Sequence, residues 1–261
     1  MTKLTMFKWV PKIDAKDKVF AALQPAIRFK KPECIDLPPV LKTTREVAMT
    51  PQQAKYYERI KTDALVVAAG QTISAVNKAA VVNMLLQISC GYVLSEDQAV
   101  VQFDATPRMN LLLEILEETD KKVLIFAMFR ASLDGIYEFL TKNGVSVGVI
   151  HGGIPANKRG GIIAAFQDTP MPRAMLMQPQ ATAHGITLTA ADTVVFYGPL
   201  MSVEMYLQCI ARSDRKGQDS DKVTVFHIQS SPVEVRLFKA MAAKVDDQAL
   251  LVSMFESEMK I

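Results

Sequence analysis

The second half of the chain alternates short apolar runs with stretches in which apolar residues recur at helical spacing. The continuous apolar runs lie at 122–129, 145–150, 173–178, 193–198 and 222–228. The stretches of helical period lie between them at 131–144, 155–167 and 202–217. A strand that is buried on both faces is apolar throughout, and helices between such strands indicate crossover connections. The pattern therefore predicts an α/β fold with a doubly wound parallel sheet.

The first half of the chain has a different texture. Helices are predicted at 50–65 and 71–90, after an extended linker at 36–40 that contains two prolines. An amphipathic helix at 107–119 leads into the first apolar run, and the tail is predicted to be helical over 232–255. Four segments follow from this pattern, namely 1–45 with the linker, 46–100 as a helical protrusion, 101–230 as the α/β domain and 231–261 as a C-terminal helix.

Composition supports a globular domain and adds little about its ligands. Hydrophobic residues make up 49% of the 261 residues and charged residues 22%, which excludes a disordered or collagen-like chain. The net charge of +3 is concentrated at the N-terminal end, because residues 1–48 alone carry +5. Three dispersed cysteines form no CxxC pair, and no apolar run is long enough for a signal peptide or a membrane span. These features predict a cytoplasmic protein without a metal site and without a membrane partner.

The common phosphate-binding loops of α/β proteins are missing. The sequence contains neither GxxxxGK[ST] nor GxGxxG after a strand, and the glycine-rich segment 152–161 lacks the Gly-Lys-Ser/Thr ending of a P-loop. No apolar run ends in the Asp-Glu pair that would hold Mg²⁺. If ATP is a ligand, this chain does not hold its triphosphate alone.

Segment 203–218 carries the most informative polar pattern. Ser202 is a candidate N-cap for a helix that Gly217 would stop. On that helix Gln208, Arg212 and Arg215 would form one polar stripe, away from the apolar face. Paired guanidinium groups can bind phosphate and stabilise charge on a transferred phosphoryl group. A solvated helix face has the same spacing, so the pattern alone leaves both interpretations open.

A series of motifs in fixed order decides between these interpretations. They are LPPV…REVAMTPQQAKYY, KVLIFAMF, VIHGG…KR…AAFQ, MQPQATAHGITLTAADTVVFYGP and YLQCIARSDRKGQ. From about Ile27 to the last apolar run, the chain resembles the second RecA-like lobe of the Swi/Snf-type ATP-dependent DNA translocases, which belong to the superfamily-two helicases. His-Gly-Ile-Thr-Leu at 184–188 is similar to short viral and bacterial members. This resemblance implies that the protein is located in the cytoplasm of a bacterium or of an infected cell.

The resemblance implies roles for individual residues. Arg212 and Arg215 match the arginine fingers of motif six, which reach ATP phosphates held by the first lobe, and the supporting positions are Gln208, Gly185 and Gln218. Two residues depart from the usual motif, since Ala211 replaces Gly and Asp214 replaces His. The implied contacts to duplex DNA fall on His151, Gly152, Gly153, Arg159, His184 and Thr187, where Thr187 replaces the usual Asn.

Several of these residues also have structural interpretations. His151 with the two glycines is equally typical of a tight turn capped by histidine, and Arg159 is typical of a solvated side chain. The basic residues Arg28, Lys30 and Lys31 could neutralise DNA phosphates or form a surface charge run. Phe7 and Trp9, beside Lys8, could stack on bases, but packing against another part of the motor is the favoured interpretation.

The resemblance predicts the second lobe of a motor whose ATP and Mg²⁺ are held mainly by a P-loop lobe, in a longer chain or in trans. It also implies that residues 1–45 form the end of the first lobe and the linker between the lobes. The isolated chain is therefore expected to be inactive. A lone lobe that binds DNA or protein without catalysis is the main alternative. A stand-alone nucleotide-binding enzyme such as a methyltransferase is disfavoured by the missing glycine-rich turn.

Overall fold

The computed structural model describes residues 2–3, 9–10, 12–23, 36–70, 75–94, 99–182 and 185–243. The chain divides into two compact units, Met1–Leu37 and Pro38–Ile261. In the smaller unit, β1 (Thr2–Lys3) pairs antiparallel with β2 (Trp9–Val10), and α1 (Ala15–Ala22) follows. Predictions for Phe7, Lys8, Arg28, Lys30 and Lys31 lie outside the described residues, as does the predicted helix beyond Ala243.

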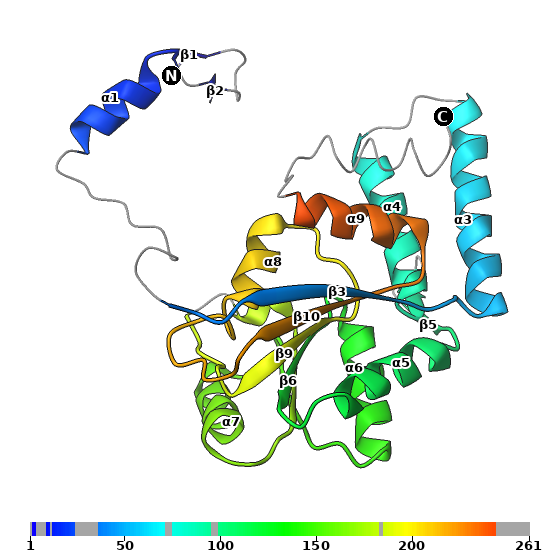
Figure 1. Ribbon diagram of the computed structural model, residues 1–261. Coiled ribbons are helices and arrows are strands. Elements are labelled where there is room, and N and C mark those ends of the chain that lie inside the picture. The colour runs from blue at the N-terminus through cyan, green and yellow to red at the C-terminus, as the bar shows by residue number, and fades with distance from the viewer. Residues whose placement is uncertain are drawn as a thin grey trace. The chain divides into compact units, whose positions relative to one another are not determined.

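The larger unit is built on a six-stranded parallel sheet (Figure 1). Its spatial order is β3-β10-β9-β6-β8-β7. The strands are β3 (Val40–Glu46), β6 (Lys122–Phe126), β7 (Val147–Ile150), β8 (Ala174–Met177), β9 (Ala191–Phe196) and β10 (Val223–Gln229). The doubly wound parallel α/β fold predicted from the sequence is confirmed.

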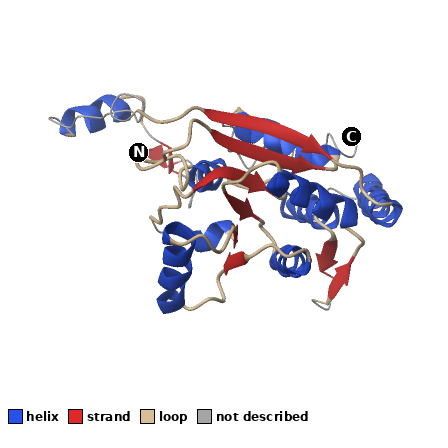
Figure 2. Ribbon diagram, turned by 60° about the horizontal axis from the view of Figure 1, so that its bottom comes forward, coloured by secondary structure: helices blue, strands red, loops and turns tan. Residues whose placement is uncertain are grey.

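Helices cover both faces of this sheet (Figure 2). One face packs against α5 (Thr106–Glu117) and α6 (Arg130–Lys142), the other against α7 (Ala156–Asp168), α8 (Val203–Ile210) and α9 (Pro232–Ala242). Alternate residues of a strand enter different cores, so in β6 Leu124 and Phe126 face one layer while Val123 and Ile125 face the other. This arrangement explains why the inner strands are apolar at most positions.

The predicted protrusion is a pair of adjacent helices (Figure 1). They are α3 (Pro51–Gly70) and α4 (Ala75–Ser89), and a small hairpin of β4 (Tyr92–Leu94) and β5 (Val100–Gln102) follows. Tyr57, Leu85 and Leu86 form a core that includes Val233 and Leu237 from α9. The helical pair therefore packs on the C-terminal helix of the α/β unit.

Two features differ from the sequence predictions. Residues 40–46 form the edge strand β3, paired along its whole length with β10, whereas the sequence indicated only an extended linker at 36–40. Most side chains of β3 are exposed, so it lacks the apolar run that marks the inner strands. The hairpin of β4 and β5 was also not predicted, because each strand has only three residues.

Candidate functional site

The helix that precedes the candidate arginine fingers is shorter than predicted. The N-cap prediction is confirmed, since Ser202 Oγ accepts a hydrogen bond from Met205 N at 3.3 Å. The helix ends at Ile210, where the chain tightens into turns with Arg212 N bonded to Cys209 O and Ser213 N to Ile210 O. The single helical stripe of Gln208, Arg212 and Arg215 is therefore wrong, because both arginines follow the helix rather than lying on it.

The two arginines nevertheless converge on one loop. Arg212 Nη1 donates to Ile186 O and Arg215 Nη1 donates to Gly185 O, each at 3.4 Å. Arg212 is only 7% exposed, and its buried Nε has no hydrogen-bond partner among the described residues. Burial, with a further contribution from Arg215, lowers the pKa of Arg212. The result is a buried guanidinium with weak protein contacts, beside an exposed one.

Gln218 fixes the backbone that carries these arginines. Its Nε2 donates to Ala191 O at 2.8 Å and to Ser213 O at 3.2 Å, while its Oε1 accepts from Ser220 N at 3.1 Å. Ser213 Oγ also donates to Ala191 O. Gly217 has φ +94°, which favours glycine at this turn. Gln218 thus ties the arginine segment to the start of β9.

The remaining residues predicted near ATP are more peripheral. Gln208 is half-buried, and its Nε2 donates to Glu204 Oε1 one turn earlier at 3.0 Å. Gly185 has φ +50° and lies in open space at the surface. Thr187 is exposed in the same loop, whereas the prediction for His184 lies outside the described residues. The loop at 185–191 therefore joins the predicted ATP-facing and DNA-facing positions.

The predicted DNA-contacting turn lies at the carboxyl end of β7. His151 is 9% exposed, and its Nδ1 accepts from Gly153 N at 2.9 Å, while Gly152 N donates to Gln178 Oε1 at 3.3 Å. Burial lowers the pKa of His151, and Arg130 and Arg159 lower it further. A Cβ on Gly153 would lie 2.9 Å from His151 Cε1. Both glycine amides are thus engaged within the turn.

Two arginines surround this turn, and the sequence indicated only one of them. Arg159 Nε donates to Ile154 O at 2.8 Å, and its Nη2 approaches the His151 and Gly152 carbonyls. Arg130, at the start of α6, places Nη1 4.0 Å from the Cβ position of Gly153 and forms an exposed ion pair with Asp134. No sequence motif marks Arg130, because it follows β6 and reaches the turn after β7 only through the order of the strands in the sheet.

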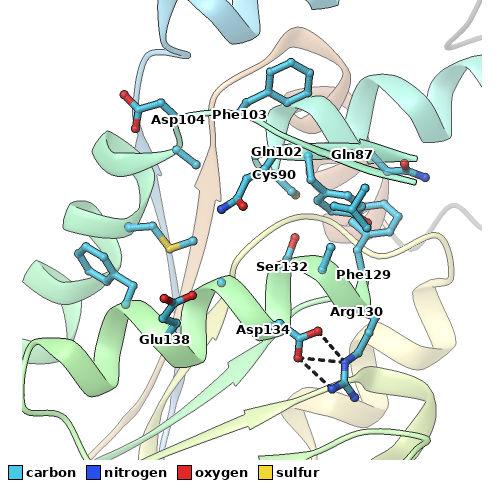
Figure 3. A pocket seen from close by; sticks show the side chains of 18 of the residues that line it. Gln87, Cys90, Gln102, Phe103, Asp104, Phe129, Arg130, Ser132, Asp134 and Glu138 are labelled. Carbon is cyan, nitrogen blue, oxygen red and sulfur yellow. Dashed lines mark hydrogen bonds and ion pairs between the residues drawn. The ribbon is translucent and has the colours of Figure 1, made fainter. Parts of the chain in front are cut away.

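A cavity of about 840 Å³ opens elsewhere, between α4, the β4–β5 hairpin and α6 (Figure 3). Its wall includes Cys90, Phe129 and Ser132 together with the carboxylates of Asp134 and Glu138. Ser132 Oγ is buried without a hydrogen-bond partner. Within the described part of the chain, none of the residues predicted to contact ATP or DNA lines this cavity.

A second arginine site, at the carboxyl ends of β9 and β10, was also missed. Arg108 and Glu234 form an ion pair of 2.7 Å with side-chain exposures of 3% and 0%. Arg108 also donates to the carbonyls of Tyr197, Ile228 and Ser89. Burial opposes the charge of Arg108, but Glu234 and neighbouring groups more than offset this, so the pKa of Arg108 is raised. In the sequence, Arg108 looks like an ordinary polar position of the predicted helix at 107–119, so the pattern does not single it out.

The described residues contain neither a metal-binding cluster nor a membrane-spanning helix. No three His, Cys, Asp or Glu side chains lie close enough together in that part of the chain to hold a metal ion. Among the same residues, no helix is long and apolar enough to span a membrane.

Comparison with known proteins identifies the α/β unit. Residues 107–217 match the helicase conserved C-terminal domain. The chain is 30% identical over 147 residues to the chromatin-remodeling ATPase INO80 of Emericella nidulans, an alignment that covers 56% of this chain and 9% of that protein. The chain carries a helicase C-terminal domain homologous to those of the Swi/Snf ATPases. The lobe predicted from the motif order is therefore confirmed.

Solved structures share the fold of this helicase C-terminal domain. The C-terminal part of the Fun30 ATPase domain has a TM-score of 0.68 at 15% identity and covers 86% of this chain and 99% of that one. The Sulfolobus solfataricus SWI2/SNF2 ATPase core in complex with dsDNA has a TM-score of 0.61 at 20% identity, over 93% and 52% of the two chains. Both likenesses extend beyond the region matched in sequence.

The relatives also correct one expectation. They include proteins of Emericella nidulans and Arabidopsis thaliana, both eukaryotes, so a viral or bacterial origin is not supported. The predicted location in the cytoplasm of a bacterium or of an infected cell is therefore not supported either. The chain matches only 9% of the INO80 protein and 12% of the Arabidopsis protein.

Proposed function

We propose that this chain is the second motor lobe of an ATP-dependent translocase of duplex DNA. It works with a P-loop lobe, either in the same longer polypeptide or in trans. The homology of its helicase C-terminal domain to Swi/Snf ATPases supports a motor role. Binding to duplex DNA is supported by the shared fold with an ATPase core whose structure contains dsDNA.

The arginine pair carries the proposal for ATP. Arg212 is buried, yet it makes one hydrogen bond of 3.4 Å within the described structure and leaves Nε unpaired. A buried cation with so little compensation is costly, and phosphate oxygens would supply the missing acceptors. Arg215 is the more accessible of the two. Together they fit a triphosphate presented by another lobe, whose bound Mg²⁺ would neutralise part of the phosphate charge.

The arginine segment has one defined chemical task in this proposal. Arg212 and Arg215 hold positive charge against the phosphoryl group as it leaves, which is where an arginine finger accelerates hydrolysis. Gln218 and Ser213 keep the backbone of the segment in place through Ala191 O. Gly185 supports the pair through its carbonyl oxygen, which accepts from Arg215, and Gln208 supports it from α8.

Contacts to DNA are proposed for the turn at 151–153, Arg159 and Thr187, and His184 is retained from the sequence motif. Because the Gly152 and Gly153 amides already have acceptors, side-chain charge from Arg159 and Arg130 is the stronger source of phosphate binding. Each phosphate contact that is removed should reduce the salt dependence of binding by roughly one unit of log–log slope. Salt titrations of Arg159→Ala and Arg130→Ala with short duplexes measure this directly.

Reconstitution with a matching P-loop lobe tests the proposed function. Neither the chain nor the P-loop lobe alone should hydrolyse ATP, whereas the two together should do so when duplex DNA is added. A P-loop lobe without its conserved lysine is the matched control. Substantial ATP turnover by the isolated chain would contradict the proposal. Salt-dependent DNA binding without any turnover in the reconstituted pair would favour the non-catalytic lobe instead.

A further inference from the structure

Helix α7 contacts the turn at 151–153 near its N-terminal end and the loop at 185–191 near its C-terminal end. It runs from Ala156 to Asp168 (Figure 1) and packs on the core through Phe166. Arg159 and Gln167 lie eight residues apart on it, a separation of about 12 Å along a helix axis. The two ends of this helix therefore contact two different parts of the proposed site.

The N-terminal end of α7 is tied to the turn. Arg159 Nε donates to Ile154 O at 2.8 Å, and Nη2 donates to His151 O at 3.4 Å and to Gly152 O at 3.3 Å. One side chain thus contacts three successive parts of the same turn. Any ligand that attracts the Arg159 guanidinium changes these contacts.

The C-terminal end of α7 is tied to the loop by a single amide side chain. Gln167 Nε2 donates to Thr189 Oγ1 at 3.0 Å, and Gln167 Oε1 accepts from Ala190 N at 3.2 Å. The same loop is held from its other side, where Leu188 N donates to Arg212 O at 2.9 Å. Gln167 and the arginine segment therefore form hydrogen bonds with neighbouring residues of one short loop.

Weak contacts at the arginines make the position of this loop important. The carbonyls of Gly185 and Ile186 accept from Arg215 and Arg212 at 3.4 Å, which is long for a hydrogen bond. A small displacement of the loop would consequently change the direction of both guanidinium groups. We propose that Gln167 is a positioning residue that links the DNA-contacting end of α7 to the placement of Arg212 and Arg215. This inference rests on the proposed function and assigns the link to one side chain.

Two glycines in the middle of α7 affect how stiff the helix is between its two ends. Gly160 and Gly161 are adjacent, exposed and surrounded by open space, since a Cβ at either position would meet nothing within 4 Å. Each glycine costs roughly 1 kcal/mol of helix stability relative to alanine. Neither lies in the positive-φ region, so alanine fits both positions without strain. The pair makes α7 more deformable between Arg159 and Gln167.

Hydrogen exchange on the isolated chain tests the link without requiring ATP hydrolysis. The amides of Leu188 and Ala190 are followed with and without a 20-base-pair duplex in four variants. Gln167→Leu removes both hydrogen bonds, and Gln167→Glu keeps acceptors for Ala190 N and for the Thr189 hydroxyl. Gly160→Ala with Gly161→Ala stiffens the helix. Gln102→Leu, at an exposed position of the hairpin, is the matched control for the loss of an amide.

We expect duplex DNA to slow exchange at Leu188 and Ala190 about tenfold in the unaltered chain and in the Gln102→Leu control. Gln167→Leu should abolish this protection while DNA affinity stays within about twofold, Gln167→Glu should restore most of it, and the alanine pair should preserve or increase it. Without DNA, Gln167→Leu should already speed exchange at Leu188.

The link is wrong if DNA protects Leu188 equally in Gln167→Leu, or if bound DNA protects it in no variant. If the chain binds no duplex, the DNA-binding part of the proposed function fails. The link is then judged by the DNA-free comparison, and unchanged exchange at Leu188 in Gln167→Leu overturns it.

Discussion

Two arginine sites in this molecule use the same side chain in opposite ways. Arg108 is almost completely buried, and each of its guanidinium nitrogens donates to a carbonyl or carboxylate oxygen at the ends of β9, β10, α4 and α9. Arg212 is also buried, but one carbonyl at 3.4 Å is its hydrogen-bond partner in the described structure and its Nε has none. Arg215 is exposed with a similarly long contact.

The contrast distinguishes an arginine that holds the fold together from arginines that are available to a ligand. All the hydrogen-bonding capacity of Arg108 is used to join strands and helices that are far apart in the sequence. Arg212 and Arg215 leave part of their hydrogen-bonding capacity unused, and the under-compensated buried charge of Arg212 lowers the stability of the fold. The two sites therefore differ in how many of the guanidinium N–H groups are hydrogen-bonded within the protein, rather than in how deeply the side chain is buried.

The largest expected effect on stability is at the saturated site. Arg108→Leu leaves the Glu234 carboxylate buried without its cation and should lower the free energy of unfolding by about 3–5 kcal/mol. Urea unfolding at pH 7 measures this. A double variant, Arg108→Leu with Glu234→Leu, should recover much of the loss because no isolated charge remains. A loss below about 1 kcal/mol for Arg108→Leu would show that the ion pair is not the main connection at this site.

The anchoring of α8 is expected to depend on pH. Tyr206 Oη contacts His227 Nε2 at 3.0 Å, and the His227 ring stacks on Phe238 at 4.4 Å. Burial, with a further effect of Lys42, lowers the pKa of His227 from 6.5 to about 4. The unfolded chain therefore binds a proton that the folded chain excludes, and stability should fall by about 2 kcal/mol between pH 7 and pH 5.

Unfolding at the two pH values, in the unaltered chain and in His227→Gln, measures this contribution. The glutamine variant cannot titrate there and should lose that part of the pH dependence. An equal fall in stability in both proteins would assign the pH dependence to other groups.

A smaller effect is expected at Gln218, which supports the arginine segment. Gln218→Leu removes the hydrogen bonds to Ala191 O, to Ser213 and from Ser220 N, but Ala191 O keeps its contact with Ser213 Oγ. The free energy of unfolding should therefore fall by only about 1 kcal/mol, while ATP turnover of the reconstituted motor should fall more than tenfold. Gln102→Leu should change neither quantity. A turnover equal to that of the unaltered protein would show that Gln218 does not position the arginines.

The sequence predicted the parts of the fold that depend on local apolar pattern. Strands β6 to β10 were predicted because each is a short, largely apolar run, and all of them except the edge strand β7 lie inside the sheet with both faces covered. Strand β3 was missed because it lies at the sheet edge with mostly exposed side chains, and only its pairing with β10 defines it. The end of α8 was misplaced because Gln218 and Ser213 draw the chain toward β9, which periodicity does not show.

Motif order located the arginine segment, but not the geometry around it. The resemblance pointed to Arg212, Arg215 and Gln218, while their contacts with the loop at 185–191 depend on tertiary structure. Arg130 was missed because it follows β6 and meets the turn after β7 only in the folded sheet, where β8 lies between these two strands. Arg108 was missed for a related reason, since its partners come from four distant segments.

The central claim is that Arg212 and Arg215 serve catalysis while Arg108 serves the fold. The most direct measurement is DNA-stimulated ATP turnover of the reconstituted motor, with urea unfolding of the same Arg212→Ala and Arg215→Ala variants. We expect kcat to fall on the order of 10³-fold or more in each, with the free energy of unfolding changed by less than about 1 kcal/mol. Near-normal turnover in both variants, or a loss of turnover explained by unfolding, would contradict the claim.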